Sequence, residues 1–414
     1  MKLKSFKDLD PYKIIFNKDK NDREINVFNI KNVSIVSDDV FYTNVLFYSN
    51  NTLIDPLDEK IMSLKAVSND KPYSLSESEN KQTINTNPLF YFIYNFDNYY
   101  HFIYDTLPYL ISYFELKKDV NNLKLLVSYP NKNKQEFYDF NLEFLSLIGI
   151  TKNDIIISNK DTLFTNVYIS ESLTHGIDSN LPPRSEIFDF YRNMTDNVSL
   201  DYETPKKIYI SRRSWVHGNK KNIGTDYTNR RRLTNEDELI SYLTNNGFSE
   251  IFTENLTTKE KIHIFKNAEI VVGPIGGGLC NLLFSPSNTK LISIISPTFL
   301  NVNYRFIYSF NNVNTYYFEE TKHNEMGRIK TNMRVKYKDI IGEVSNISDN
   351  YATIIYKAEF TAGWSSNDIF KEIKCLITDL TPIDDGLNSP WQINMNKFKK
   401  YYEERFTDIP SRIF

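Results

Sequence analysis

The sequence is poor in cysteine and has no long apolar segment. Its 414 residues include two cysteines, which are too few for a disulfide framework or a structural zinc site. The N-terminal stretch MKLKSFKDLDPYKIIF has acidic residues and a proline where a signal peptide needs an apolar core. No run reaches the roughly 18 apolar residues that a membrane span requires. We therefore expect a soluble, cytoplasmic protein without a membrane span.

An excess of basic residues is also absent. Lys and Arg total 49 against 52 Asp and Glu, so the formal net charge is -3 and the chain lacks the basic footprint of a nucleic-acid-binding protein. Hydrophobic residues make up 41% of the chain, with 28 Tyr and 29 Phe. This composition predicts a folded globular protein, and the length allows two or three domains.

Several catalytic signatures are missing. The sequence contains no H-E-x-x-H, no paired Cys and His ligands and no G-x-S-x-G nucleophile elbow. These absences argue against zinc hydrolases and serine esterases. We predict neither a bound metal nor another resident cofactor.

Strand and helix patterns alternate twice along the chain. Residues 1–85 indicate short strands, with the polar loop SNDKPYSLSESENKQTINTN at their end. After this loop LKLLVSY, DIIIS and LFTNVYIS predict strands, and KQEFYDFNLEFLSLIGI predicts a helix. A polar joint follows near TDNVSLDYETPKK. Beyond it KIYISRR, SEIFTE, EIVVG and KLISIIS predict strands.

The helices of the second alternation carry end signals. LTNEDELISYLTNNGF has Thr234 as its expected N-cap and Gly247 just past its end. TTKEKIHIFKNA has Thr257 and Glu260 at capping-box spacing. A further helix is predicted to begin at LCNLLF.

These two alternations predict an α/β fold with two Rossmann-like domains facing a cleft. Residues 1–195 form the first domain, with a β-rich N-terminal segment, and residues 196–326 form the second. Residues 327–414 form a C-terminal extension of mixed strands with a closing helix, of unknown role.

A glycine run lies between a strand and a helix in the second alternation. The stretch VVGPIGGGLCNLLF places Gly276, Gly277 and Gly278 where unpaired helix-terminal N–H groups can meet an anion. Its spacing is not the dinucleotide fingerprint, and no P-loop lysine follows. A tight turn that needs small residues is an equally open interpretation of this stretch alone.

Arginines flank the loop that follows the first strand of this half. Arg212 and Arg213 end the strand KIYISRR, where ligands of such sheets bind, and a guanidinium suits a diphosphate. Arg231 and Arg232 belong to the run before the next helix, where a solvated surface is the alternative. Arg212 is the strongest candidate.

Three further polar residues are weaker candidates in this half. Asn235 and Glu236 stand in a helix's first turn, where such residues are expected for capping alone. Glu254 follows the strand SEIFTE at the same edge as the arginines and could bind a ribose hydroxyl or simply be structural.

In the first half, NYYHFIYDTLP contains a candidate base. His101 and Asp105 are four residues apart and share one face if the segment is helical. Either could accept the proton of an attacking hydroxyl, and a surface or buried contact between them is the structural alternative. The neighbouring aromatic residues could belong to the core or stack on a sugar.

Taken in order, the stretches NYYHFIYDTLP, YISRR, RRLTNEDEL and AEIVVGPIGGGLCNLLF resemble glycosyltransferase family 61. The resemblance covers about residues 25–320. The family includes plant xylan arabinosyl- and xylosyltransferases, N-acetylglucosaminyltransferases that modify EGF repeats or O-mannose, and bacterial capsule-locus proteins. The positions that match its motifs are Asn98, His101, Asp105, Pro108, Ser211, Arg212, Arg213, Arg231, Arg232, Asn235, Glu236, Gly273, Pro274, Gly276, Gly278, Leu279, Asn281 and Phe284.

The resemblance implies a GT-B-like arrangement, with the acceptor on the side of the first domain and the nucleotide sugar on the side of the second. It implies inverting transfer from a nucleotide sugar, UDP-linked in our interpretation, to a hydroxyl of a glycan or glycoprotein, without an essential metal. It places Arg212, the glycine amides and Asn281 at the donor. Asp105 or His101 would be the base, and we favour Asp105 because a carboxylate also stabilises positive charge at the anomeric carbon.

The sequence departs from the family pattern in the donor motif. Ile275 stands where the family usually has His, Gly277 where it has Ala, Cys280 where it has Thr, and Ser293 where Glu is common. The alternative hypothesis is therefore a catalytically degenerate carbohydrate-binding or scaffold protein with the same fold.

Overall fold

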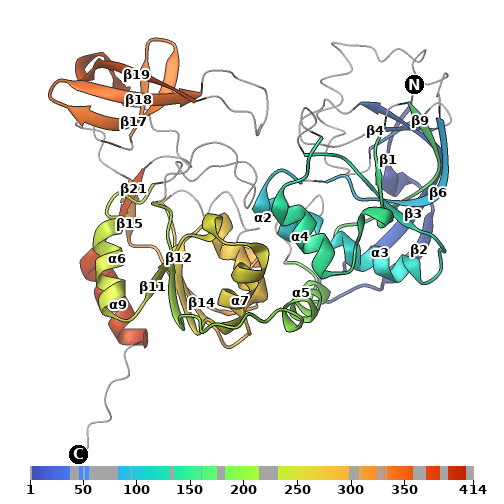
Figure 1. Cartoon of the computed structure of the whole chain (residues 1–414), viewed down its shortest axis with the longest axis horizontal. Coiled ribbons are helices and arrows are strands. Elements are labelled where there is room, and N and C mark those ends of the chain that lie inside the picture. Colours follow the sequence, from blue (N-terminus) through green and yellow to red (C-terminus); the bar gives the residue numbers. More distant parts are fainter. Residues whose placement is uncertain are drawn as a thin grey trace, which may run out of the picture. The chain divides into compact units, whose positions relative to one another are not determined.

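The structure is a computed structural model in which the chain divides into two compact units between Asn197 and Val198. It describes residues 2–37, 46–49, 52–55, 83–94, 96–130, 135–159, 161–174, 182–213, 232–297, 307–310, 312–323, 329, 331, 333–357, 370–382 and 390–406. We call the part before this division the N-terminal unit and the part after it the C-terminal unit (Figure 1).

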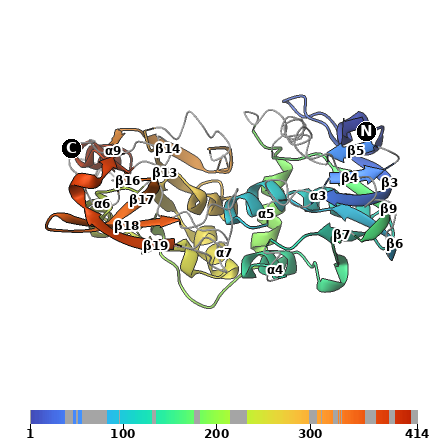
Figure 2. The same cartoon turned by 90° about the horizontal axis from the view of Figure 1, so that it is seen from above.

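The N-terminal unit is built on a mixed sheet with the order β1-β5-β4-β3-β9-β6-β7-β8, and β2 also pairs with β3 (Figure 2). Strands β9, β6, β7 and β8 are parallel, whereas β2, β3, β4, β5 and β9 are joined by antiparallel pairs. The strands are β1 (Lys2–Ser5), β2 (Pro11–Phe16), β3 (Ile25–Ser37), β4 (Leu46–Ser49), β5 (Thr52–Asp55), β6 (Thr83–Tyr91), β7 (Lys124–Val127), β8 (Ile155–Ile157) and β9 (Thr162–Ser170).

The prediction of a polar loop over SNDKPYSLSESENKQTINTN is wrong at the C-terminal end of that stretch. Strand β6 begins at Thr83, inside the stretch that polarity marks as a loop. Its first half pairs in parallel with β9, starting at Thr83 opposite Thr162, so ladder hydrogen bonds hold residues that local composition assigns to a turn. Only its last residues, Leu89–Tyr91, are fully buried.

The helical segments of this unit are α2 (Tyr99–His101), the π-helical turn η3 (Phe102–Thr106), α3 (Tyr109–Lys117), α4 (Asp139–Leu147) and α5 (Glu186–Asp196), with short 3₁₀ turns at η1 (Phe6–Asp8) and η4 (Lys152–Asp154). One of them, α4, lies within the stretch KQEFYDFNLEFLSLIGI that predicts a helix. Phe102 packs against Phe140 and Phe144 of α4 at ring distances of 5.5 and 6.2 Å. This aromatic contact holds the segment that carries His101 against α4.

The C-terminal unit contains a five-stranded, fully parallel sheet with the order β11-β10-β12-β13-β14. This is the doubly wound order 2-1-3-4-5. The strands are β10 (Lys207–Ile210), β11 (Ser249–Ile251), β12 (Ile270–Pro274), β13 (Lys290–Ile294) and β14 (Asn314–Phe318); the helical segments are α6 (Glu236–Asn245), η5 (Thr253–Asn255), α7 (Thr258–Asn267) and η6 (Gly277–Phe284). The chain is thus α/β. The GT-B arrangement of the two halves stays a prediction.

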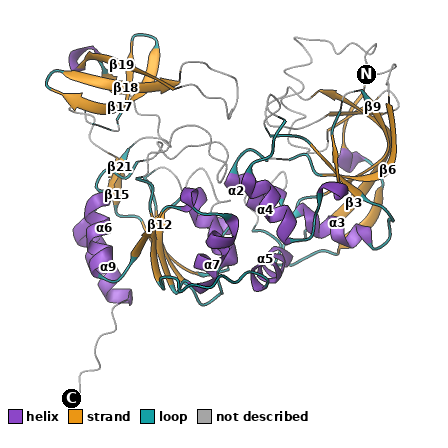
Figure 3. Cartoon of the chain, viewed as in Figure 1, coloured by secondary structure: helices purple, strands orange, loops and turns teal. Residues whose placement is uncertain are grey.

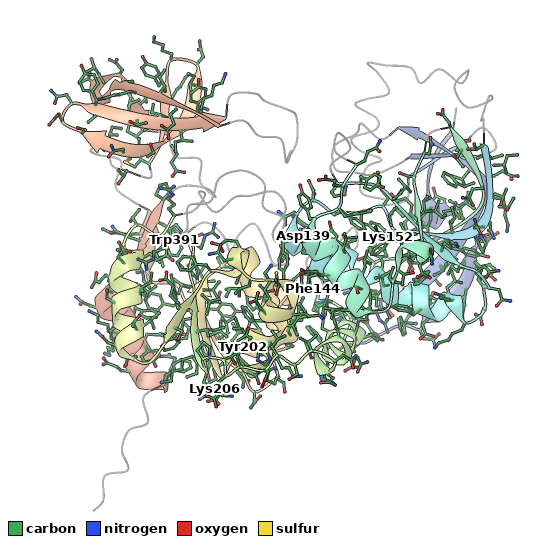
Figure 4. All side chains as sticks on the ribbon, viewed as in Figure 1. Asp139, Phe144, Lys152, Tyr202, Lys206 and Trp391 are labelled. Carbon is green, nitrogen blue, oxygen red and sulfur yellow. The ribbon has the colours of Figure 1, made fainter. Side chains whose placement is uncertain are left out.

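The end of the chain returns to this same sheet. Strand β21 (Trp391–Ile393) pairs with β15 (Thr321–His323), and helix α9 (Met395–Phe406) lies beside α6, on the face of the sheet opposite α7 (Figure 3). Trp391, labelled in Figure 4, is 1% exposed and belongs to one core with residues of β10, α6, β12 and β13. The expected boundary at residue 326 therefore separates residues that share a hydrophobic core, because packing joins segments far apart in sequence.

A second, antiparallel sheet occupies residues 334–382. Its order is β19-β18-β17-β16-β20, with strands β16 (Arg334–Tyr337), β17 (Ile340–Ser348), β18 (Tyr351–Lys357), β19 (Phe370–Leu376) and β20 (Thr381–Pro382), and a 3₁₀ turn at η7 (Ile377–Asp379). Its own core includes Val335, Val344 and Ile354. One face of this sheet packs on this core.

Candidate functional site

The carboxyl ends of β10 and β12 bring Arg212 against the glycine run. In a doubly wound sheet of this order, ligands bind at the switch point, which here lies between β10 and β12. Arg212 follows β10 and Gly276 follows β12. A Cβ atom added to Gly276 would lie 2.5 Å from Arg212 Nη1 and 3.7 Å from Cζ. Glycine at 276 therefore allows the guanidinium to lie directly against the backbone.

The helical segment η6 begins at the same edge, with Gly277 as its first residue. The first N–H groups of a helix have no acceptor within it, and they favour an anion. The segment is a 3₁₀ helix, as shown by the hydrogen bond from Leu279 N–H to the Gly276 carbonyl at 3.1 Å. At Gly278 a Cβ would lie 2.9 Å from Ile210 Cγ2, so this glycine allows η6 to pack closely on β10. The glycines therefore serve both close packing and an open edge of amides.

Glu236 holds the end of β10. It is the first residue of α6 and only 2% exposed. Its Oε1 accepts hydrogen bonds from the Tyr209 hydroxyl at 2.8 Å, Ser211 Oγ at 3.2 Å and the Arg212 backbone N–H at 2.9 Å. Burial raises the pKa of Glu236, whereas these hydrogen bonds and the Arg212 charge act in the opposite direction. The carboxyl group thus binds the backbone from which Arg212 extends.

Arg213 has partners on the protein itself. Its Nε and Nη2 donate to the two carboxylate oxygens of Glu250 at 2.8 and 2.6 Å, and its Nη1 donates to Asp237 at 2.8 Å. These pairs raise the pKa of Arg213 further above its usual range. Its guanidinium is therefore directed at α6 and β11, and its role at a donor stays a prediction.

The structure directs Arg232 and Asn235 toward the C-terminal part of the chain. Arg232 Nε lies 2.9 Å from Oε1 of Glu343 in β17, and both side chains are buried. The Asn235 side chain donates to the Ile393 carbonyl at 2.9 Å and accepts from the Ile393 N–H at 3.0 Å. Its amide therefore pairs with β21 as a neighbouring strand would. Arg231 lies outside the described residues.

Two further candidates lie at the predicted edge. Glu254, in η5 just after β11, is 5% exposed. Asn281 is fully buried in η6 and donates from Nδ2 to the Gly278 carbonyl at 2.9 Å. This bond stabilises the first turn of η6, so Asn281 helps to hold the backbone of the glycine run in place.

Three of the four positions that depart from the family pattern, namely Ile275, Cys280 and Ser293, are buried. Ile275 is 2% exposed and its N–H donates to the Ile294 carbonyl at 2.9 Å, which extends the pairing of β12 with β13. Cys280 donates from Sγ to the Gly277 carbonyl at 2.6 Å. Ser293 is fully buried, opposite Gly273 in the sheet, and within the described part of the chain its hydroxyl makes no hydrogen bond.

In the N-terminal unit, His101 and Asp105 are in contact. His101 Nδ1 and Asp105 Oδ2 are 2.6 Å apart, across the junction of α2 and the π-helical turn. Asn98 caps the N-terminus of α2 by accepting from the His101 N–H at 3.3 Å. The His101 side chain is 38% exposed and that of Asp105 only 9%. A buried carboxylate therefore holds an accessible imidazole.

Asp97 is a neighbouring titratable residue that the sequence interpretation missed. Burial raises its pKa to about 6, and the nearby His101 lowers it in part. The signal was the spacing of four residues between Asp97 and His101, the same as that between His101 and Asp105. Asp97 lies just before the N-cap of α2, and Asp105 follows His101 by one helical turn.

Among the described residues, no helix is long and apolar enough to cross a membrane. No group of three or more His, Cys, Asp or Glu side chains within the described ranges is arranged to hold a metal ion. The expectation that no metal is needed stays a prediction.

A comparison with protein families matches the model for glycosyltransferase 61 over residues 99–292. This range includes the His101–Asp105 pair, Arg212 with its strand, and the glycine run. No curated protein matches the chain in a sequence search. Glycosyltransferases of such families use a nucleotide-sugar donor and a glycan acceptor. Residues 99–292 of the chain are therefore identified as a glycosyltransferase family 61 region.

Proposed function

We propose that the protein is an inverting glycosyltransferase that moves a sugar from a UDP-linked donor to a hydroxyl of a glycan or glycoprotein. The observation that carries the proposal is the placement of the Arg212 guanidinium against Gly276, at the switch point of a parallel sheet. A permanently charged, planar donor group beside the N-terminus of η6 suits a diphosphate.

Negative charge grows on the nucleoside diphosphate as the glycosidic bond breaks. Groups that are already in place when this charge develops stabilise the transition state without reorganisation. Arg212 and the first N–H groups of η6 would fill this role, and they supply at the diphosphate the positive charge that a metal ion supplies in other enzymes. We therefore propose transfer without a resident metal, and we expect full turnover in excess chelator.

We assign the proton transfer to the His101–Asp105 pair. The greater exposure of His101 favours it as the group that meets the acceptor hydroxyl, with Asp105 orienting the ring through Nδ1. This differs from the sequence-based preference for Asp105, which rested on charge alone. In the inverting reaction the hydroxyl oxygen attacks the anomeric carbon, its proton passes to His101, and UDP leaves with the bonding electrons.

Arg212→Ala tests the donor assignment. We expect UDP affinity to fall by about 10- to 100-fold, since a hydrogen bond to a charged group contributes about 1.5–3 kcal/mol. Titration calorimetry with UDP measures this in the full chain. Arg192→Ala is the matched control, because Arg192 is an exposed arginine whose guanidinium pairs with Asp189 of the same helix, α5. Unchanged UDP binding by the Arg212 variant would refute the assignment.

The catalytically degenerate alternative makes a different prediction in the same assay. If the replacement of the family's polar side chain by Ile275 has abolished donor binding, the protein would bind neither UDP nor UDP-sugars. Measurable UDP binding that depends on Arg212, together with sugar transfer to an acceptor panel, supports the enzyme.

A further inference from the structure

Residues at the end of β10 and just beyond it bind one buried carboxyl group. Tyr209 and Ser211 are two residues apart, so in extended backbone their side chains point to the same side. Both hydroxyls donate to Glu236 Oε1, and the Arg212 N–H donates to the same oxygen. One atom therefore fixes Tyr209, Ser211 and Arg212 at the point where the strand ends.

An ordinary helix-capping role does not explain this geometry. An acidic residue in the first turn of a helix stabilises the helix through its own free N–H groups. Glu236 instead accepts all three of these hydrogen bonds from β10 and the two residues after it, and the neighbouring first-turn acids Asp237 and Glu238 face Arg213 and Lys399. These contacts of Glu236 are thus made to the end of β10 and to the residues that lead from it to Arg212.

The chemistry at this position requires a carboxylate. Oε1 accepts three donors, and the negative charge of an ionised carboxylate makes each of these bonds stronger than the bond that a neutral amide oxygen would accept. Oε2 is buried and makes no hydrogen bond within the described part of the chain, so a Gln side chain would leave its NH₂ group without an acceptor there. Glutamine therefore keeps the shape of the Glu236 side chain but does not restrain the end of β10 in the same way.

We propose that Glu236 is a positioning residue of the donor site: its carboxylate sets the place from which Arg212 reaches the diphosphate. The proposal rests on the proposed function, because it presumes that Arg212 binds the donor. It predicts that the effect of Glu236 on donor binding passes through the Arg212 guanidinium.

A double-mutant cycle tests this dependence. The variants are Glu236→Gln, Arg212→Lys and both together, with UDP affinity measured by calorimetry in the full chain. Lysine keeps the charge but not the planar fork, so residual binding remains measurable. We expect Glu236→Gln to weaken UDP binding about tenfold in the natural background and less than about twofold in the Lys background, since coupled residues are not additive. In turnover assays, Glu236→Gln should raise the KM for the donor more than it lowers kcat.

Two further variants separate positioning from general stability. Glu238→Gln removes a charge from the same helical turn at an exposed residue, and UDP affinity should not change. Tyr209→Phe removes one of the three donors and should give a smaller loss than Glu236→Gln. Thermal unfolding of each variant shows whether the fold persists.

The outcomes distinguish the two proposals. Equal weakening by Glu236→Gln in both backgrounds would show an effect independent of Arg212 and overturn the positioning role, as would no weakening at all. If Arg212→Lys itself binds UDP as tightly as the natural protein, the donor assignment fails instead. If Glu236→Gln weakens UDP binding only in the natural background, the positioning proposal is supported.

Discussion

Replacing Gly276 with alanine should disable Arg212 without removing it. The new Cβ would lie 2.5 Å from Arg212 Nη1, whereas non-bonded atoms prefer about 3.5–4.0 Å, so the guanidinium must retreat by roughly 1 Å. The backbone at Gly276, with φ 163° and ψ -178°, is extended, and alanine adopts this conformation readily. The substitution therefore displaces a flexible side chain and leaves the fold unstrained.

The size of the effect on donor binding and turnover follows from how strongly both depend on the position of the binding group. A shift of about 1 Å can cost on the order of 100-fold in rate. We expect UDP affinity and kcat/KM for the donor to fall by about 10- to 100-fold, matching the loss of a charge-assisted hydrogen bond. The midpoint of thermal unfolding should change little.

The assay is UDP titration calorimetry on Gly276→Ala, Arg212→Ala and the double variant. Removing the Arg212 side chain makes room for the new methyl group, so the double variant should bind no more weakly than Arg212→Ala alone. Gly278→Ala is the contrasting control: its Cβ would meet buried Ile210 at 2.9 Å and should lower stability by about 1–3 kcal/mol. UDP affinity within twofold of the natural protein in Gly276→Ala, or a fully additive double variant, would refute the reasoning.

Three other predictions concern the base and the fold. His101→Gln should reduce kcat by about 10²–10⁴-fold with UDP affinity unchanged, and weaker UDP binding in that variant would contradict the assignment. Burial raises the pKa of Asp97 from 3.8 to about 6, so its contribution to stability is complete below pH 3.8 and is lost as pH rises through about 6. Asp97→Asn should therefore be more stable than the natural protein at about pH 8, by on the order of 1–2 kcal/mol in chemical denaturation, and equal stability at that pH would contradict the shift. Trp391→Ala should destabilise the C-terminal unit by about 3–5 kcal/mol, and an unchanged unfolding midpoint would show that residues 391–406 are dispensable to its core.

Local patterns in the sequence carry much of the C-terminal unit. Alternating apolar strands and capped helices indicate the α/β class, and Thr257 and Glu260 form the predicted capping box, with mutual hydrogen bonds of 2.7–3.3 Å. These features depend on neighbours within one helical turn. Strand β6 shows the limit of such patterns, because its polar first half is held by pairing with β9 far along the chain.

The candidate site shows the same division. The order of residues along the chain suffices to place Arg212, Arg213 and the glycine run at one edge, because parallel strands present their carboxyl ends together. Order does not reveal which arginine turns toward Gly276. Successive residues of an extended chain point to opposite sides, so the carboxylates of Glu250 and Asp237 engage Arg213, and Arg212 lies against Gly276.

Long-range packing settled what motif spacing left open. Asn235 and Glu236 are adjacent in one motif, yet Asn235 pairs with Ile393, more than a hundred residues away, and Glu236 binds the end of β10. The sequence alone identified the family and the edge where chemistry is expected. Which side chains face a ligand and which ones hold the scaffold depends on three-dimensional contacts, because hydrogen-bond partners and buried neighbours come from segments whose proximity no local pattern encodes.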